Sequence, residues 1–196
     1  GGVQQLVGLR FPSIPLSNGE YVTRADIQFT TRDTTNVDSG ILNLQGEASD
    51  NAVAFSGSAR ISTRPRTSAT VAWDPPAWLT IGEAGIGQRT NDVSAIVQEI
   101  IGRSGWRANG ALAFVVSGST GYRRNAWQFD GNPAGAPVLH IEYQSAYYGN
   151  LHNHGQLFAN MFRARHRTFI QHNKWDLPQA DGMEFDQYDT PASRWV

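Results

Sequence analysis

The spacing of apolar residues changes at Tyr143, and this change limits most strongly which folds the chain can adopt. Before Tyr143, apolar and polar residues alternate in short runs separated by turn residues, which is typical of half-buried β-strands. From Leu157 onward, apolar residues recur every three or four positions, which is typical of a helix. We therefore expect two parts, residues 1–143 and residues 144–196.

Five runs of the first part carry the strand pattern. In the second of them, Ala25, Ile27 and Phe29 alternate with polar residues and are expected to face a core. Turn-forming clusters rich in Gly, Pro, Asn and Asp lie between the runs, as expected between short strands. The five predicted strands are 6–11, 24–30, 41–47, 111–117 and 138–143.

The last two runs differ in how much of each strand should be buried. Residues 111–117 are almost wholly apolar, which predicts a strand covered on both faces. Residues 138–143 alternate again, and Leu139, Ile141 and Tyr143 are expected to face inward.

One helix interrupts the strand pattern, because five apolar residues recur at spacings of three and four. Thr90 or Asn91 is expected to cap its start, and Asp92 suits the first turn electrostatically. Gly102 or Gly105 is expected to end it. Short strands with one covering helix predict a mainly β fold, an antiparallel β-sandwich of jelly-roll type. The apolar stripe consists of Val93, Ile96, Val97, Ile100 and Ile101.

Composition excludes several classes of function. The chain has 16 basic and 17 acidic residues and a net charge of −1, with no basic stripe, so we expect no nucleic-acid partner. No apolar run approaches the length of a membrane span. There is no cysteine, so neither a disulfide nor a thiolate nucleophile is available.

The first part resembles the DNRLRE-type surface modules of bacteria over residues 5–143. The similarity lies in the runs GLRFPSIPLSNGEYVTRADIQF, LQGEASDNAVAF, ISTRPRTSATVAWDPPAW, GEAGIGQRTNDVSAIVQEIIGRSGW and FDGNPAGAPVLHIEY. The resemblance implies a β-sandwich appended to secreted or surface proteins, in some cases a carbohydrate-binding module. It implies an extracellular or cell-surface location and no catalysis, with a polysaccharide or a cell-surface component as partner.

Four tryptophans of this part could stack against the C–H faces of a sugar, or could instead be core or rim packing. Trp78 and Trp127 are the better candidates for a binding platform, because both lie beside predicted loops. The other two are Trp73 and Trp106.

Three carboxylates lie in turn-rich segments and could supply oxygen ligands for calcium. They are Glu47, Asp50 and Asp130. The alternative is that they form turns or remain solvated, and no cofactor is expected otherwise.

The second part begins with a predicted amphipathic helix. Arg165 lies on its apolar face, where a guanidinium either reaches the edge or is held by a carboxylate. Asp186 and Asp189, on a predicted strand at 183–189, are the candidate partners. Alternation places the two on opposite faces, so both meet Arg165 only if the strand breaks. The other residues of the apolar face are Phe158, Met161, Phe162 and Phe169.

Residues 150–196 resemble the N-terminal part of the acyl-homoserine-lactone synthases, the bacterial autoinducer synthases. The match rests on the order and spacing of Arg165, Phe169, Trp175, Asp186 and Asp189. It implies an acetyltransferase-like fold that transfers an acyl group from acyl carrier protein to S-adenosylmethionine. The first three residues would belong to a mobile region closing over this substrate. Asp186 would place its amine, and Asp189 would hold Arg165.

Three hypotheses follow. The leading one is a non-catalytic extracellular module with a structural or carbohydrate-binding role, carrying an incomplete synthase-like segment. The second is an acyl-homoserine-lactone synthase acting in quorum sensing, which would be cytoplasmic. We expect no synthase activity from this chain, because the later strands of that fold, with their acyl-transfer cleft, have no counterpart before Val196. The third is a filament subunit that self-associates through exposed strand edges.

Overall fold

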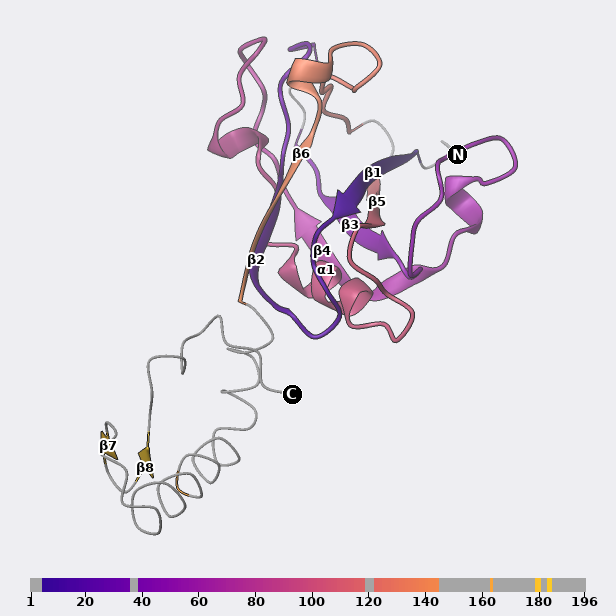
Figure 1. Ribbon diagram of the computed structural model, residues 1–196. Helices are drawn as coiled ribbons and strands as arrows, with labels where there is room; N and C mark the ends of the chain where they lie inside the picture. Colours follow the sequence, from indigo (N-terminus) through magenta and orange to yellow (C-terminus); the bar gives the residue numbers. More distant parts are fainter. Residues whose placement is uncertain are drawn as a thin grey trace. The chain divides into compact units, whose positions relative to one another are not determined.

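A computed structural model gives the arrangement of the chain (Figure 1). It describes residues 5–35, 39–118 and 122–144, together with Arg163 and the short segments 179–180 and 183–184. The chain divides into two compact units, Gly1–Tyr143 and Gln144–Val196.

The described part of the first unit is mainly β, with one α-helix, so the predicted fold class is confirmed. All five predicted strands are present, and the structure adds β4, which was not predicted although Ala69, Val71 and Trp73 alternate with exposed residues. Three short 3-10 turns lie in the connections, at Ile61–Thr63, Ile86–Gln88 and Pro133–Gly135. The strands are β1 (Leu6–Ile14), β2 (Tyr21–Gln28), β3 (Leu42–Glu47), β4 (Arg66–Trp73), β5 (Gly110–Gly118) and β6 (Val138–Gln144), and the helix is α1 (Ser94–Ile101).

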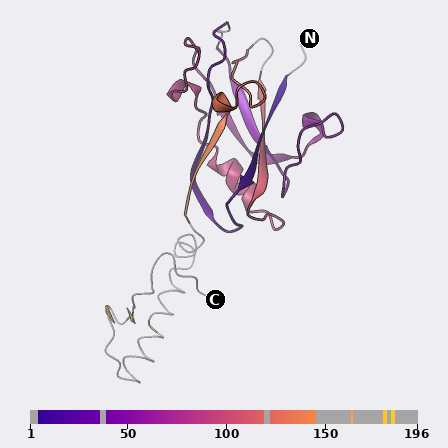
Figure 2. The ribbon, with the colours of Figure 1, turned by 45° about the horizontal axis from the view of Figure 1, so that its top comes forward.

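The strands form two sheets. The larger has the order β1-β5-β3-β4, and all three of its pairings are antiparallel. The smaller consists of β2 and β6, which run side by side in Figures 1 and 2. One hydrophobic core draws residues from both sheets and from the helix. The arrangement is therefore sandwich-like.

The alternation read from the sequence predicts which face of most strands is buried. Ala25 and Ile27 of β2 are buried and Phe29 follows them into the core. Leu139 and Ile141 of β6 are partly buried against the same core. Tyr143 was expected inward and is 47% exposed, so this prediction is wrong. Tyr143 lies near the end of β6, where the described chain offers no neighbouring surface to cover it.

Strand β5 is covered on both faces, as its apolar sequence predicts. Leu112 and Phe114 belong to the main core. On the opposite face, Ala111 and Ala113 pack against Ala52 in a small second cluster that Phe55 covers.

Helix α1 packs against β2, β3 and β4, and the five residues of its predicted stripe are all buried. Neither Thr90 nor Asn91 caps it. The Thr90 hydroxyl instead accepts a hydrogen bond from the Ile27 amide, and the Asn91 side chain donates to Ala72. Asp92 accepts from the Ser94 amide at 2.9 Å, and Gly102 ends the helix as predicted.

The described residues of the second unit are few. Two short strands, β7 (Gln179–Ala180) and β8 (Met183–Glu184), pair antiparallel, and Arg163 is helical and exposed. Met183–Glu184 begins the predicted strand 183–189, whose remainder lies outside the described residues. Within the part of the chain that the structure describes, no helix combines the length and apolar character needed to cross a bilayer.

Candidate functional site

Trp78 is a core residue, so its prediction as a sugar platform is wrong. It is 2% exposed, and its indole N–H donates to the Gly87 carbonyl at 3.0 Å. Its ring packs against Phe29 and Trp73 at centroid distances of 6.3 and 6.4 Å. A ring enclosed in this way offers no free face to a sugar. Trp73 and Trp106, 4% and 0% exposed, are core residues as well.

Trp127 is half-buried and remains a candidate platform. It lies on a short two-stranded ribbon, where Thr31 and Ala126 form an antiparallel bridge and the Trp127 amide donates to Thr30. Because Thr31 and Ala126 face the core, alternation places Arg32 and Trp127 together on the outer face. The Arg32 guanidinium carbon lies 5.4 Å from the centroid of the indole, within the range of a cation–π contact.

A carboxylate and an amide lie on the same ribbon. Asn125 lies opposite Arg32 in the ribbon, because the Arg32 amide donates to the Asn125 carbonyl. The side-chain amide of Asn125 donates to both oxygens of Asp33, at 2.8 and 2.9 Å. The hydrogen bond from Asn125, with those from Thr35, lowers the pKa of Asp33 to about 2. The carboxylate is therefore ionised at neutral pH. We call Arg32, Asp33, Asn125 and Trp127 the Trp127 surface.

The Trp127 surface offers the kinds of groups that hold polyhydroxylated ligands. An exposed part of an indole gives apolar area for C–H groups. Asp33 accepts hydrogen bonds, Arg32 donates them, and the Asn125 amide can do both. The sequence indicated Trp127 alone. The other three residues were missed, because their proximity depends on pairing between segments about ninety residues apart.

Two of the three predicted calcium ligands are bonded to arginines. Glu47 is a buried end residue of β3, and its carboxylate accepts from Arg64 at 2.5 Å. Asp50 accepts from Arg103 at 2.6 Å. Asp130 is exposed in a turn. The described residues contain no group of three or more histidines and carboxylates able to hold a metal ion, and nothing in the structure brings these three predicted ligands together.

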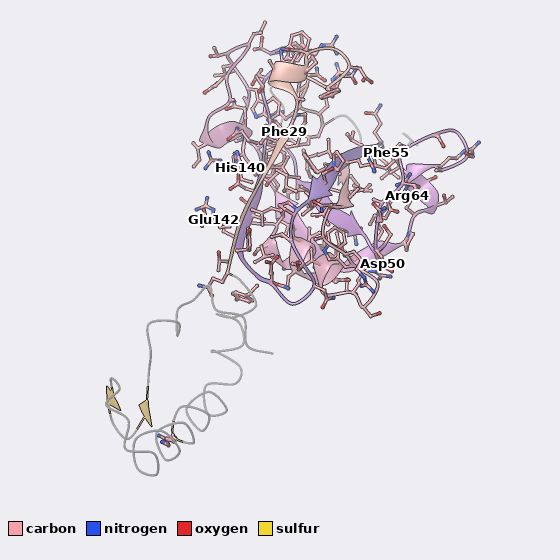
Figure 3. The ribbon with its side chains drawn as sticks, viewed as in Figure 1. Phe29, Asp50, Phe55, Arg64, His140 and Glu142 are labelled. Carbon is pink, nitrogen blue, oxygen red and sulfur yellow. The ribbon has the colours of Figure 1, made fainter. Side chains whose placement is uncertain are left out.

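The outer face of β2 and β6 carries a cluster of charged residues. Asp26 is 6% exposed, and its carboxylate lies 3.6 Å from Arg24, 3.5 Å from Arg89 and 3.1 Å from His140. Figure 3 shows His140 and Glu142 on the same outer side of β6. Alternation placed Arg24 and Asp26 on this face, but Arg89 and His140 are brought to them by the fold.

A shallow hollow of about 560 Å³ lies over the end of β1. Phe55 forms one wall and is held by Arg64, whose guanidinium carbon lies 4.3 Å from the ring centroid (Figure 3). The phenyl ring rests on Gly8, where an added Cβ would lie 2.5 Å from its tip. The hollow was not predicted, and no buried charged side chain lines it. The other lining residues are Leu6, Ser56, Ala59, Arg60, Ile61 and Ser62.

The predicted substrate-binding residues of the second unit lie outside the described residues, so the structure tests none of them. They are Arg165, Phe169, Trp175, Asp186 and Asp189.

Comparison with known proteins gives one match. The family model described as Autoinducer synthase matches residues 149–196, which is less than half of the chain. This match agrees with the resemblance of residues 150–196 to such enzymes. Comparisons with curated proteins and with solved structures gave no match.

Proposed function

We propose that residues 1–143 form a non-catalytic module that binds a carbohydrate through the Trp127 surface. The observation that carries the proposal is the half-buried Trp127 indole in contact with Arg32, on a ribbon that also carries the hydrogen-bonded pair of Asp33 and Asn125. Stacking on the ring would hold the sugar, and the polar groups would orient its hydroxyls. The resemblance to DNRLRE-type surface modules supports the same role and an extracellular or cell-surface location.

The test is a glycan array probed with the full chain, followed by titration calorimetry with a soluble fragment of any polysaccharide that binds. Trp127→Ala should weaken binding about five- to thirtyfold, because loss of one stacking contact of this size is worth about 1–2 kcal/mol. Tyr21→Ala is the matched control, because Tyr21 is 54% exposed and begins β2, at the end remote from Thr30.

Two results would count against this proposal. Equal affinity of the Trp127→Ala and unaltered chains would move binding to another surface. A blank array would leave residues 1–143 with a structural role only.

A second candidate function rests on the match to Autoinducer synthase over residues 149–196. In this proposal, residues 144–196 are a synthase-like segment, and Arg165, Phe169, Trp175, Asp186 and Asp189 contact S-adenosylmethionine, which would place the protein in the cytoplasm. Titration calorimetry with S-adenosylmethionine tests it. Binding that is lost in both Arg165→Ala and Asp186→Ala supports the proposal, whereas the absence of heat with the unaltered chain would rule it out.

A further inference from the structure

Strand β6 is an edge strand, and no described segment other than β2 pairs with it. The other sheet edges are occupied or interrupted. On β4, the Glu99 carboxylate accepts from the Ser68 and Ala69 amides at 2.8 and 2.7 Å. The far side of β2 bonds to the segment 86–93 through backbone amides and carbonyls.

Strand β1 is also an edge, but its own sequence interrupts it. Pro12 lacks an amide hydrogen, and the pairing register shifts between Phe11 and Ile14. Ser13 has a φ of 57°, which bends the backbone there. Proline and bulges of this kind prevent an edge from recruiting another strand. In contrast, β6 contains no proline and has no described bulge.

The sequence of β6 matches itself in one antiparallel register. If a twofold axis passes through Ile141, His140 of one copy lies opposite Glu142 of the other, and this pair occurs twice. On the inner face, Leu139 lies opposite Tyr143 and Ile141 opposite its own counterpart. His140 contacts Asp26 through Nδ1, so its Nε2 is the atom that would meet the Glu142 carboxylate, and opposed apolar side chains also favour sheet pairing.

Neighbouring registers lack this match. Moving the axis to residue 140 places His140 opposite His140 and Glu142 opposite Val138, and moving it to residue 142 places Glu142 opposite Glu142 and His140 opposite Gln144. The first shift loses the histidine–carboxylate pairs, and the second sets two carboxylates directly opposite each other, which destabilises a sheet. The register centred on Ile141 is therefore favoured over both.

We propose that the chain forms a twofold dimer by antiparallel pairing of two β6 strands about Ile141. Pairing joins two two-stranded sheets into one four-stranded sheet of order β2-β6-β6-β2, and small sheets gain stability from added strands. It also covers part of Tyr143, which is 47% exposed near the end of β6. An isologous contact of this kind closes after two copies and builds no filament.

Cysteine cross-linking tests the register, because the chain contains no cysteine. His140→Cys and Glu142→Cys chains are mixed and oxidised. Opposed positions fall within the Cα separation of a disulfide, so the mixture should give a disulfide dimer and each variant alone much less. Val53→Cys, which is 59% exposed on a loop, is the control for collision. Equal cross-linking of the mixture and the Val53→Cys control would overturn the register.

Sedimentation velocity of the full chain tests the dimer itself. Glu142→Lys should raise the dissociation constant about tenfold, because both His–Glu pairs lose their carboxylate. Asp130→Lys, the same charge reversal on an exposed turn, should leave it unchanged. An unaltered chain that stays monomeric at its highest soluble concentration overturns the proposal, as do assemblies larger than two copies.

Discussion

Arg64 is a charged residue with almost no exposed surface, and every contact of its guanidinium is internal. Its nitrogens donate to the Glu47 carboxylate and to the carbonyls of Val53, Ala54 and Ala59. The same group lies over the Phe55 ring. Arg64 therefore fixes the connection between β3 and β4 over the outer face of the larger sheet.

Replacing Arg64 with Met should destabilise the chain by about 3–5 kcal/mol, because the Glu47 carboxylate would remain buried without its partner. The double variant Glu47→Gln, Arg64→Met should recover part of this loss, since it buries no charge. Denaturation with urea, followed by circular dichroism, measures both free energies of unfolding. A double variant as unstable as the single one would contradict the explanation.

Asp33 gives a pH-dependent contribution to stability with a defined sign. Hydrogen bonds from Asn125 and Thr35 lower its folded-state pKa from 3.8 to about 2. Its stabilisation is therefore complete above the unfolded pKa and is lost as the pH falls from about 4 to about 2. A carbon-13 NMR titration should give a midpoint near 2, rising toward 3.8 in Asn125→Ala. An unchanged midpoint would show that Asn125 is not the cause.

At the scale of elements, α1 and β3 approach so closely that only glycine fits between them. A Cβ at Gly46 would lie 2.7 Å from both Ile96 and Ile100. Ile96 and Ile100 of the helix occupy the space that a side chain at position 46 would need. This position of β3 therefore requires glycine.

Gly46→Ala should destabilise the chain by about 1–3 kcal/mol through overpacking. Ile100→Val, which removes one of the two methyl groups that lie 2.7 Å from the new Cβ, should restore part of the loss when combined with Gly46→Ala. Gly57→Ala is the matched control, because nothing lies within 4 Å of a Cβ there. Thermal unfolding compares the variants, and equal midpoints for Gly46→Ala and Gly57→Ala would contradict the prediction.

The sequence predicts elements better than it predicts their ends or their neighbours. The stripe of α1 and the alternation of β2 identify buried faces, because both patterns are local. The caps were wrong, since Thr90 and Asn91 bond to strands distant in sequence. Trp78 was misplaced for a similar reason, because a loop position says nothing about whether the loop folds over a core.

In the candidate sites too, the sequence identified single residues but not the partners that the fold brings to them from distant segments. Trp127 was identified as a residue type beside a loop, whereas its neighbours Arg32 and Asp33 come from a segment about ninety residues earlier. Glu47 and Asp50 were taken for calcium ligands, because their arginine partners lie 17 and 53 residues away in the sequence.

At the scale of the whole molecule, the chain divides at the position where the spacing of apolar residues changes. The two compact units are Gly1–Tyr143 and Gln144–Val196. The hydrophobic core that the structure describes lies entirely within the first unit. We therefore expect the first unit to fold without the second.

A chain ending at Gln144 should unfold cooperatively at the same temperature as the full chain, within a few degrees, because it retains every described contact of the core. Scanning calorimetry of both chains at equal concentration is the measurement. A fall of about ten degrees or more in the shorter chain would show that residues 145–196 contribute to the stability of the first unit.

The order of strands in the two sheets also has a consequence for biosynthesis. Strand β1 pairs with β5, and β2 pairs with β6, so the strands made first have partners made last. During translation, β1 remains without its sheet partner until residue 118 has emerged, and β2 until residue 144 has emerged. Folding of the first unit must therefore follow synthesis of nearly all of it, and such distant pairings are slow to form. Over that interval the unpaired apolar strands are exposed, and exposed strands of this kind are prone to aggregation.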